Sequence, residues 1–496
     1  MKKFISIILS LSMIFSICSL TFAEETEQVC NGDCGILPVV YVPGFGDGIY
    51  IDPESDDPTA IYPPSISDIL KAVPDLFIAI FGVTIGSDDI FGKYAVNAAN
   101  KLLGKLACDE NGVPVYDSSI DPLGEPIFDY HQNVTDDVNE RSYTYRYDWR
   151  LSPLDNAEGL KVYIEKVKAL THHDEIVIVC HSQGNTVVAS YLELYGNEGI
   201  RKIAFLSPAF QGISILGSLY SKEADITGKA DQLRYFVKTL MPQGAGADIV
   251  STLIGTLNLT GLTDGLLNFL QGYLNSSFDK IYDECLMPAF GNLAGTWSFV
   301  PDEYFDDAVA AMFNGREDAP ILKKIIYYHD NVQVKLPEIL QNAMDNGTDI
   351  MICAGYNISS IPVVPSDAGH SDFLIDTKYM SIGAICAPLQ GTLGEGYTQA
   401  VDCGHNHVSA DLQIDASTCA FPEYTWFFKG MNHNVFPNGY DKFVNVFLAS
   451  EERMTVHTYE EYPQFMAIDE NDQLIPVTAE EDANGFIAFF EKVFNF

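Results

Sequence analysis

The stretch that decides the fold is Ile176-Val177-Ile178-Val179-Cys180-His181-Ser182-Gln183-Gly184-Asn185. A run of β-branched residues as long as a strand ends at a serine, with a glycine two positions later. Apolar residues then recur at helical spacing, at Val187, Val188, Tyr191, Leu192 and Tyr195. A strand that turns at a serine and passes directly into a helix is typical of a nucleophile elbow. We therefore interpret Ser182 as a nucleophile; the alternative is an ordinary strand-to-helix loop with a surface serine.

The elbow departs from the usual G-x-S-x-G pattern at one position. Cys180 stands where the first glycine is usual. That position requires a small side chain because the following helix crosses the strand there. A cysteine is small enough, so the departure is compatible with an elbow.

The charge and composition of the chain exclude some classes of function. The formal net charge is −40, from 28 basic and 68 acidic residues. Such a surface repels phosphate backbones, so we expect no nucleic-acid binding. A hydrophobic content of 47% and an aromatic content of 12% predict a large folded core.

The first residues have the pattern of a secretory signal. Lys2 and Lys3 form a charged start, an apolar run follows from Phe4 to Leu20, and Thr21-Phe22-Ala23 offers a cleavage site. We expect residues 1–23 to be removed and the protein to be secreted.

Two membrane-bound alternatives fit less well. A lipoprotein anchor at Cys18 would require small residues before it, where the chain has Ile17. The most apolar later segment, residues 249–274, is interrupted by Asn258 and Asp264. We therefore expect no transmembrane anchor.

Strand and helix patterns alternate along most of the chain. Short apolar strands are predicted at residues 38–42, 142–147, 176–181, 203–206, 350–354 and 425–428, and helices at residues 66–106, 157–170, 320–345 and 483–494. This alternation predicts an α/β fold with a mostly parallel sheet covered by helices on both faces. We divide the chain into a signal peptide (1–23), a first core part (24–211), a helical cap or lid insertion (212–318) and a second core part (319–496).

The insertion at residues 212–318 lacks strand patterns. Leucines recur in it at helical spacing, at Leu253, Leu257, Leu262, Leu266, Leu267, Leu270 and Leu274. One interpretation is a helical segment that packs on the core. The other is a lid whose apolar face covers the active site and makes transient contact with a lipid interface.

A serine nucleophile requires a base, and the base requires an orienting carboxylate. In folds with a nucleophile elbow the acid and then the histidine follow the serine along the chain. His433 lies after the predicted strand at residues 425–428, so we assign it as the base. His405 and His407 are weaker competitors.

Three aspartates compete for the role of the acid. Asp411 precedes the strand that leads to His433, and we assign it as the orienting carboxylate. Asp415 and Asp372 remain alternatives, because Ser371–Asp376 (SDFLID) echoes Ala410–Asp415 (ADLQID).

The developing oxyanion requires two backbone N–H donors. The N–H of Gln183, directly after the nucleophile, is one candidate. The loop Gly44-Phe45-Gly46 follows the first predicted strand, and its glycines allow close approach to a substrate. We assign the N–H of Phe45 as the second donor.

Several of these segments together resemble the lecithin:cholesterol acyltransferase family. They are Pro38–Gly46, Tyr147-Asp148-Trp149-Arg150-Leu151-Ser152-Pro153, His181-Ser182-Gln183-Gly184 and the pair Asp411 and His433. The Y-D-W-R element is the most specific, since serine hydrolases in general lack it. The resemblance implies an α/β-hydrolase fold with cap insertions, a Ser–Asp–His triad and acyl transfer from a lipid ester through an acyl-enzyme.

The Y-D-W-R element has two interpretations. The resemblance favours substrate contact by Asp148 and Trp149. The residues by themselves also fit a structural pair of Asp148 with Arg150 at the end of a strand.

A second cluster contains metal-ligand residue types. Cys403, His405 and His407 in Asp402-Cys403-Gly404-His405-Asn406-His407 are able to ligate zinc, but the segment offers no clear fourth ligand. We therefore assign no metal, and no nucleotide, flavin or haem motif indicates another cofactor.

Two functions follow from this reading. The first is a secreted serine lipase, esterase or O-acyltransferase that acts on lipid esters through Ser182, Asp411 and His433. The alternative is a non-catalytic binding protein of the cell exterior with the same fold, motivated by the degenerate elbow and by the unusual acid loop around Asp411.

Overall fold

The structure is a computed structural model. It describes residues 35–46, 48–51, 59–120, 142–224, 272–273, 275–360, 369–389, 391–469 and 471–478. The expected signal peptide, the leucines from Leu253 to Leu274 and the helix expected at residues 483–494 lie outside the described residues.

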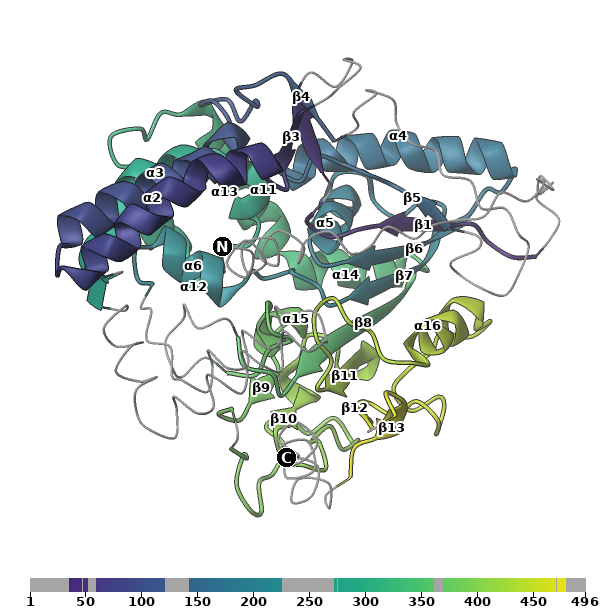
Figure 1. Cartoon of the computed structure of the whole chain (residues 1–496). Helices are drawn as coiled ribbons and strands as arrows, with labels where there is room; N and C mark the ends of the chain where they lie inside the picture. Colours follow the sequence, from purple (N-terminus) through teal and green to yellow (C-terminus); the bar gives the residue numbers. More distant parts are fainter. Residues whose placement is uncertain are drawn as a thin grey trace.

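An eight-stranded sheet forms the centre of the molecule (Figure 1). Its strands lie in the order β13-β12-β11-β8-β7-β6-β1-β5. Their bounds are β1 Val39–Val42, β5 Ser142–Thr144, β6 Ile176–His181, β7 Ile200–Leu206, β8 Asp349–Tyr356, β11 Thr425–Lys429, β12 Phe465–Ile468 and β13 Leu474–Pro476. Neighbouring strands are parallel except β12 and β13, which are antiparallel. The predicted α/β fold with a mostly parallel sheet is confirmed.

Helices cover both faces of this sheet. On one side lie α4 (Pro153–Thr171), α5 (Gly184–Tyr195) and α14 (Leu336–Asp345), and on the other lies α16 (Tyr440–Ala449). Along β6, Ile176, Ile178 and Cys180 pack into the first core, whereas Val177 and Val179 pack into the second. Both faces of β6 are buried, which explains why its sequence is apolar without alternation.

Some predicted elements differ from the observed ones. The helix expected at residues 320–345 consists of α13 (Pro320–Tyr328), a π-helical turn (His329–Gln333) and α14. Pro337 lies in the first turn of α14, where a proline is tolerated because the N–H that it lacks would have no acceptor within the helix. In the interior of one continuous helix the same proline would remove a hydrogen bond. The edge strands β12 and β13 were not anticipated by the sequence analysis.

A helical layer lies beside the sheet and is built from two parts of the chain. The first part contains α2 (Ile66–Thr84), α3 (Asp88–Leu103) and a 3-10 turn (Gly104–Leu106). The second contains α6 (Ser214–Tyr220), a π-helical turn (Tyr282–Leu286), α10 (Met287–Phe290), α11 (Ala294–Trp297) and α12 (Asp302–Met312). The two parts are in contact, since the Asn100 amide donates a hydrogen bond of 2.9 Å to the Glu284 carbonyl. Among the described residues, no helix combines the length and the apolar character needed to cross a membrane.

The remaining elements are short. A small sheet contains β2 (Ile49–Ile51), β3 (Thr59–Tyr62) and β4 (Ser118–Ser119). Between β8 and β11 lie α15 (Thr377–Met380), the paired strands β9 (Ile385–Cys386) and β10 (Ile414–Asp415), and the 3-10 turns Ala416–Thr418 and Pro422–Tyr424. This long connection carries all three aspartates that compete for the role of the acid.

Candidate functional site

Ser182 lies at a sharp turn between β6 and α5. Its backbone has a φ of 53°, a left-handed conformation that non-glycine residues rarely adopt. A Cβ atom on Gly184 would lie 2.1 Å from the Val42 carbonyl oxygen, so only glycine fits there. These two observations identify the turn as the elbow that the sequence predicts.

Cys180, two residues before Ser182, stabilises the elbow through a hydrogen bond. Its buried thiol donates a hydrogen bond of 3.2 Å to the Asn185 side-chain oxygen. The Asn185 amide in turn donates to the Ser182 carbonyl at 2.8 Å and to the Leu206 carbonyl at 3.3 Å. Burial raises the pKa of Cys180 well above its ordinary value, so the thiol stays protonated and keeps its role as a donor. A cysteine therefore replaces the usual glycine without disturbing the turn.

The structure brings His433 to Ser182. The His433 Nε2 atom lies 2.9 Å from Ser182 Oγ, and both side chains are buried. His433 follows β11 in a short loop, and its backbone N–H donates to the Asp372 carbonyl at 2.8 Å. His433 thus occupies the position that the sequence analysis assigns to it, whereas His405 and His407 lie in a separate cluster.

The carboxylate on His433 belongs to Asp372. Its Oδ2 atom lies 2.7 Å from His433 Nδ1. Its Oδ1 atom accepts hydrogen bonds from the N–H groups of Leu374 and Ile375 at 3.1 and 2.8 Å. A Cβ atom on Gly355, near the end of β8, would lie 2.8 Å from the Asp372 Cβ, so this glycine allows the close approach. Every oxygen of this fully buried carboxylate therefore has a partner.

Asp411, which the sequence analysis preferred as the acid, does not contact His433; the contact is made by Asp372, one of its two alternatives. The Asp411 Oδ2 atom pairs with Lys429 Nζ at 3.0 Å and accepts a hydrogen bond from the Tyr356 hydroxyl at 3.1 Å. Its Oδ1 atom accepts from the Ser409 hydroxyl at 2.6 Å. These contacts fix Asp411 to the end of β11, because Lys429 supplies the charge that a buried carboxylate requires.

Asp415 is also engaged elsewhere. Its Oδ2 atom accepts from the Tyr397 hydroxyl at 2.9 Å and from the Ala400 N–H at 2.8 Å. Its Oδ1 atom accepts from the Ser417 N–H at 2.9 Å. Asp415 therefore organises the connection between β8 and β11.

His181 fixes the loop that carries His433. Its Nε2 atom lies 3.0 Å from the His433 carbonyl oxygen, to which it donates, and the two rings are 4.9 Å apart. Burial, with the neighbouring His433 as a smaller cause, lowers the pKa of His181 to about 3. His181 is therefore a neutral donor at neutral pH.

This shift makes the stability of the protein dependent on pH. Histidine in an unfolded chain has a pKa of about 6.5, so below that pH the unfolded chain binds a proton that folded His181 does not. The free energy of unfolding therefore falls as the pH falls. Between pH 7 and pH 5 the His181→Gln variant, which keeps an N–H donor, should lose about 2 kcal/mol less than the wild type. Urea unfolding at both pH values measures this difference, and equal losses in both proteins would contradict it.

Both backbone segments expected to form the oxyanion hole border Ser182. Gln183 is the N-cap residue of α5, and the N–H groups at the start of a helix have no acceptor within it. The Gln183 side chain is fixed by hydrogen bonds to the carbonyls of Trp149 and Gly295 at 3.0 and 3.2 Å. A Cβ atom on Gly44 would lie 2.6 Å from the Ser182 Cβ, so the loop that contains Phe45 passes directly beside the serine.

The Y-D-W-R element lies next to this loop. Asp148 forms an ion pair with the fully buried Arg150, with its Oδ2 atom 2.7 Å from Arg150 Nη2. The Trp149 ring is buried and contacts the rings of Phe45 and Tyr62, with centroids 4.1 and 5.0 Å away. The Asp148 carboxylate is thus used by Arg150, which agrees with the structural interpretation of this pair.

The side chains of Ser182, His433 and Asp372 are arranged for proton transfer. A neutral His433 that donates its Nδ1–H to Asp372 presents the lone pair of Nε2 to the Ser182 hydroxyl. Such an imidazole can accept the serine proton, and the Asp372 carboxylate would stabilise the resulting imidazolium.

Comparisons with known proteins agree with the sequence motifs. The family model described as lecithin:cholesterol acyltransferase matches residues 132–232, a segment that contains the Y-D-W-R element and the elbow. This match confirms the resemblance to that family. No curated protein matches the chain. One similar solved structure is the crystal structure of the Tle4–Tli4 complex, 12% identical, which covers 64% of this chain and 75% of that chain with a TM-score of 0.23.

Proposed function

We propose, from the match of residues 132–232 to the lecithin:cholesterol acyltransferase family, that this protein is a serine lipase, esterase or O-acyltransferase. It would act on lipid esters through an acyl-enzyme on Ser182. The observation that carries the proposal is the hydrogen-bonded chain from Ser182 through His433 to Asp372 at a strand-to-helix elbow. Turnover of p-nitrophenyl esters of graded acyl length by the wild type and by Ser182→Ala tests it.

The proposed mechanism has two halves. His433 takes the Ser182 proton while Oγ attacks the ester carbonyl, and His433 then returns the proton to the leaving alcohol as the acyl-enzyme forms. In the second half His433 activates water or an acceptor alcohol, which attacks the acyl carbon and releases Ser182. Hydrolysis and acyl transfer differ only in this second nucleophile.

The oxyanion would be held by two backbone donors, the N–H groups of Gln183 and Phe45. Trp149 supports the second donor, because its ring packs on that of Phe45 and its carbonyl fixes the Gln183 side chain. We therefore propose Trp149 as a residue that positions the oxyanion loop, with Asp148 acting through its ion pair with Arg150.

The fold of the proposed enzyme is that of an α/β-hydrolase with a cap. The family match and the order Ser182, Asp372, His433 along the chain support this proposal. In it, residues 24–211 and 319–496 form the core and residues 212–318 contribute the cap. Secretion belongs to the same proposal and rests on the charged and apolar start of the sequence.

The alternative of a non-catalytic binding protein loses its motivation. It rested on Cys180 at the elbow and on an unusual acid loop around Asp411. Cys180 has a hydrogen-bonding role that leaves the turn intact, and Asp372 rather than Asp411 contacts His433.

The proposed cap predicts a dependence on lipid interfaces. If the leucine face around Leu266 covers the site in water, contact with a lipid aggregate would favour the open state by roughly 25 cal/mol per Å² of apolar area transferred. The reaction rate should therefore rise abruptly when a sparingly soluble ester passes its solubility limit. Leu266→Asp should remove this rise. A smooth saturating curve, unchanged by the substitution, would identify the insertion as ordinary packing.

A further inference from the structure

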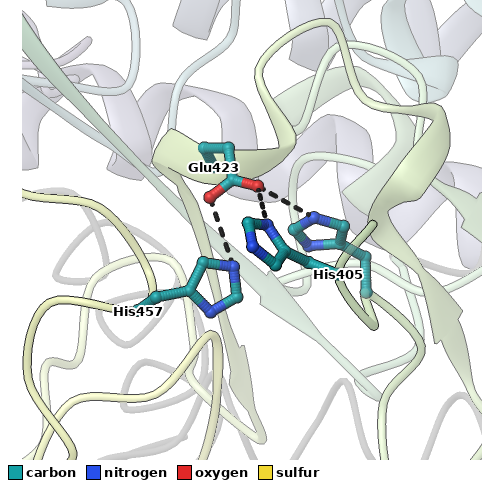
Figure 2. Close-up of side chains that lie close together, drawn as sticks. His405, Glu423 and His457 are labelled. Atoms are coloured by element: carbon teal, nitrogen blue, oxygen red, sulfur yellow. Dashed lines mark hydrogen bonds and ion pairs between the residues drawn. The ribbon is translucent and has the colours of Figure 1, made fainter. Parts of the chain in front are cut away.

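Three histidines and a glutamate from separate segments converge at one place outside the triad (Figure 2). His405 and His407 come from the loop before β10, Glu423 from the 3-10 turn before β11, and His457 from the loop after α16. One donor atom from each side chain lies within 4.8 Å of the others. Figure 2 shows the Glu423 carboxylate facing the rings of His405 and His457.

The Glu423 carboxylate is close to all three rings. Its Oε1 atom lies 2.8 Å from His405 Nδ1 and 3.3 Å from His407 Nε2, and its Oε2 atom lies 3.2 Å from His457 Nε2. Both oxygens of the Glu423 carboxylate are therefore directed at the imidazole rings.

The tautomer of His407 is fixed by Gln464. His407 Nδ1 lies 2.7 Å from the Gln464 Oε1 atom. The Gln464 amide nitrogen donates to the carbonyls of Pro422 and Thr425 at 2.7 and 3.1 Å, so its oxygen must face the histidine. A neutral His407 therefore carries its proton on Nδ1 and directs the lone pair of Nε2 toward Glu423.

This lone pair is open to a cation. His407 is fully buried, and within the part of the chain that the structure describes its Nε2 atom has no hydrogen-bond partner. Two electron-rich atoms, His407 Nε2 and Glu423 Oε1, face each other at 3.3 Å. A metal ion between them would bind both atoms. A ligating histidine that donates its other ring N–H to a fixed oxygen is the usual arrangement around protein-bound zinc.

We propose that His405, His407, Glu423 and His457 bind a divalent transition-metal ion of the zinc type. Imidazole nitrogens with one carboxylate suit zinc, and four protein ligands close a tetrahedral site. Bonds of about 2.0–2.2 Å would place the ligand atoms about 3.4 Å apart. The most separated atoms must move closer by about 1.4 Å. His405 and His457 are about half-exposed, so their side chains can make this movement.

The ion would stabilise the connection that leads to the triad. The Val456 N–H donates to the Glu423 carbonyl at 2.9 Å, which joins the second and third segments. Gln464 joins the first to the second, because its side chain contacts both His407 Nδ1 and the Pro422 carbonyl. Glu423 directly precedes β11, the strand that ends at the His433 loop. Because four ligands leave no open position, the site would be structural and independent of the proposed ester chemistry.

Sequence analysis found only part of this site. The segment at residues 402–407 contributes His405 and His407, but Cys403 is not a member of the group and its Sγ atom lies 3.7 Å from the His405 carbonyl. Glu423 and His457 supply the ligands that the segment itself lacks. The expectation of no metal rested on that missing ligand.

The test is direct zinc binding by the purified full chain. The protein is treated with a chelator, dialysed against buffered zinc and analysed by elemental mass spectrometry, with one zinc per chain expected. Zinc affinity should fall by about tenfold or more in His405→Ala, His457→Ala and Glu423→Gln. It should also fall in acid, because histidine must be unprotonated to bind metal. Cobalt in place of zinc should give the visible absorption of a tetrahedral site.

Two comparisons make the result decisive. His172→Asn removes an exposed histidine outside the group and should bind zinc like the wild type. Circular dichroism of each variant checks that it folds. Because His405 and His457 are about half-exposed, their replacement should leave the fold intact. The proposal is overturned if the folded wild type binds no zinc, or if the ligand variants bind it as tightly as His172→Asn does.

Discussion

Replacing Ser182 by alanine should lower kcat for p-nitrophenyl ester hydrolysis about 10⁶-fold, since removing a triad serine removes the covalent route. Alanine lacks the Oγ atom through which Ser182 forms its hydrogen bond with His433. The substitution leaves the backbone atoms of the turn in place. A fluorophosphonate probe, which reacts with activated serines, should label a peptide that contains Ser182 in the wild type and no such peptide in the variant.

A second serine provides the control. Ser190 lies on α5, the same helix that follows the elbow, and its hydroxyl donates to the Thr186 carbonyl within that helix at 2.8 Å, away from His433. Ser190→Ala should therefore retain the wild-type kcat. An active Ser182→Ala, or a wild type that neither hydrolyses esters nor reacts with the probe, would rule out the proposed mechanism.

Replacing Asp372 by asparagine should lower kcat by about 10⁴ while leaving the fold intact. An asparagine amide facing His433 Nδ1 favours the wrong imidazole tautomer, in which Nε2 carries the proton and cannot accept one from Ser182. Steady-state kinetics with a p-nitrophenyl ester measure this loss, and urea unfolding reports the stability of the same samples.

Asp411→Asn should show the opposite pattern. It should keep kcat near the wild-type value but lose about 3 kcal/mol of unfolding free energy, because the ion pair between the buried Asp411 carboxylate and Lys429 would be broken. The two variants carry the same chemical change on similar loops, so they act as controls for each other. Should Asp411→Asn be the inactive protein and Asp372→Asn the active one, the assignment made from the structure is wrong.

The central sheet and the placement of Ser182 and His433 could be predicted because their signals are local. The apolar run at Ile176–His181, the glycine at position 184 and the helical spacing that follows all describe one strand–turn–helix unit. Glycine is required at position 184 because a Cβ atom there would collide with the Val42 carbonyl oxygen of β1. The same glycine is part of the general nucleophile-elbow pattern, so it can be recognised from the sequence alone. His433 was found because it lies directly after a recognisable strand.

The choice between Asp372 and Asp411 could not be made locally, since both aspartates form the same turn. In each the Oδ1 atom accepts the N–H two residues later, from Leu374 or from Gln413. The residue after each aspartate has a positive φ, 90° at Phe373 and 55° at Leu412. The echo in the sequence therefore reflects a real similarity of local structure.

Only the packing around each turn separates the two aspartates. Gly355 leaves room for Asp372 to approach the His433 loop. Asp411 instead contacts Tyr356 and Lys429, the last residues of β8 and β11. Those contacts join residues far apart in a connection that has little regular secondary structure, so no periodicity in the sequence reports them. The approach of Glu423 and His457 to His407 likewise depends on how distant segments pack together. Local hydrogen bonds and steric limits are encoded by neighbouring residues and can be predicted from them, whereas the partner of a buried charge depends on how distant segments pack together.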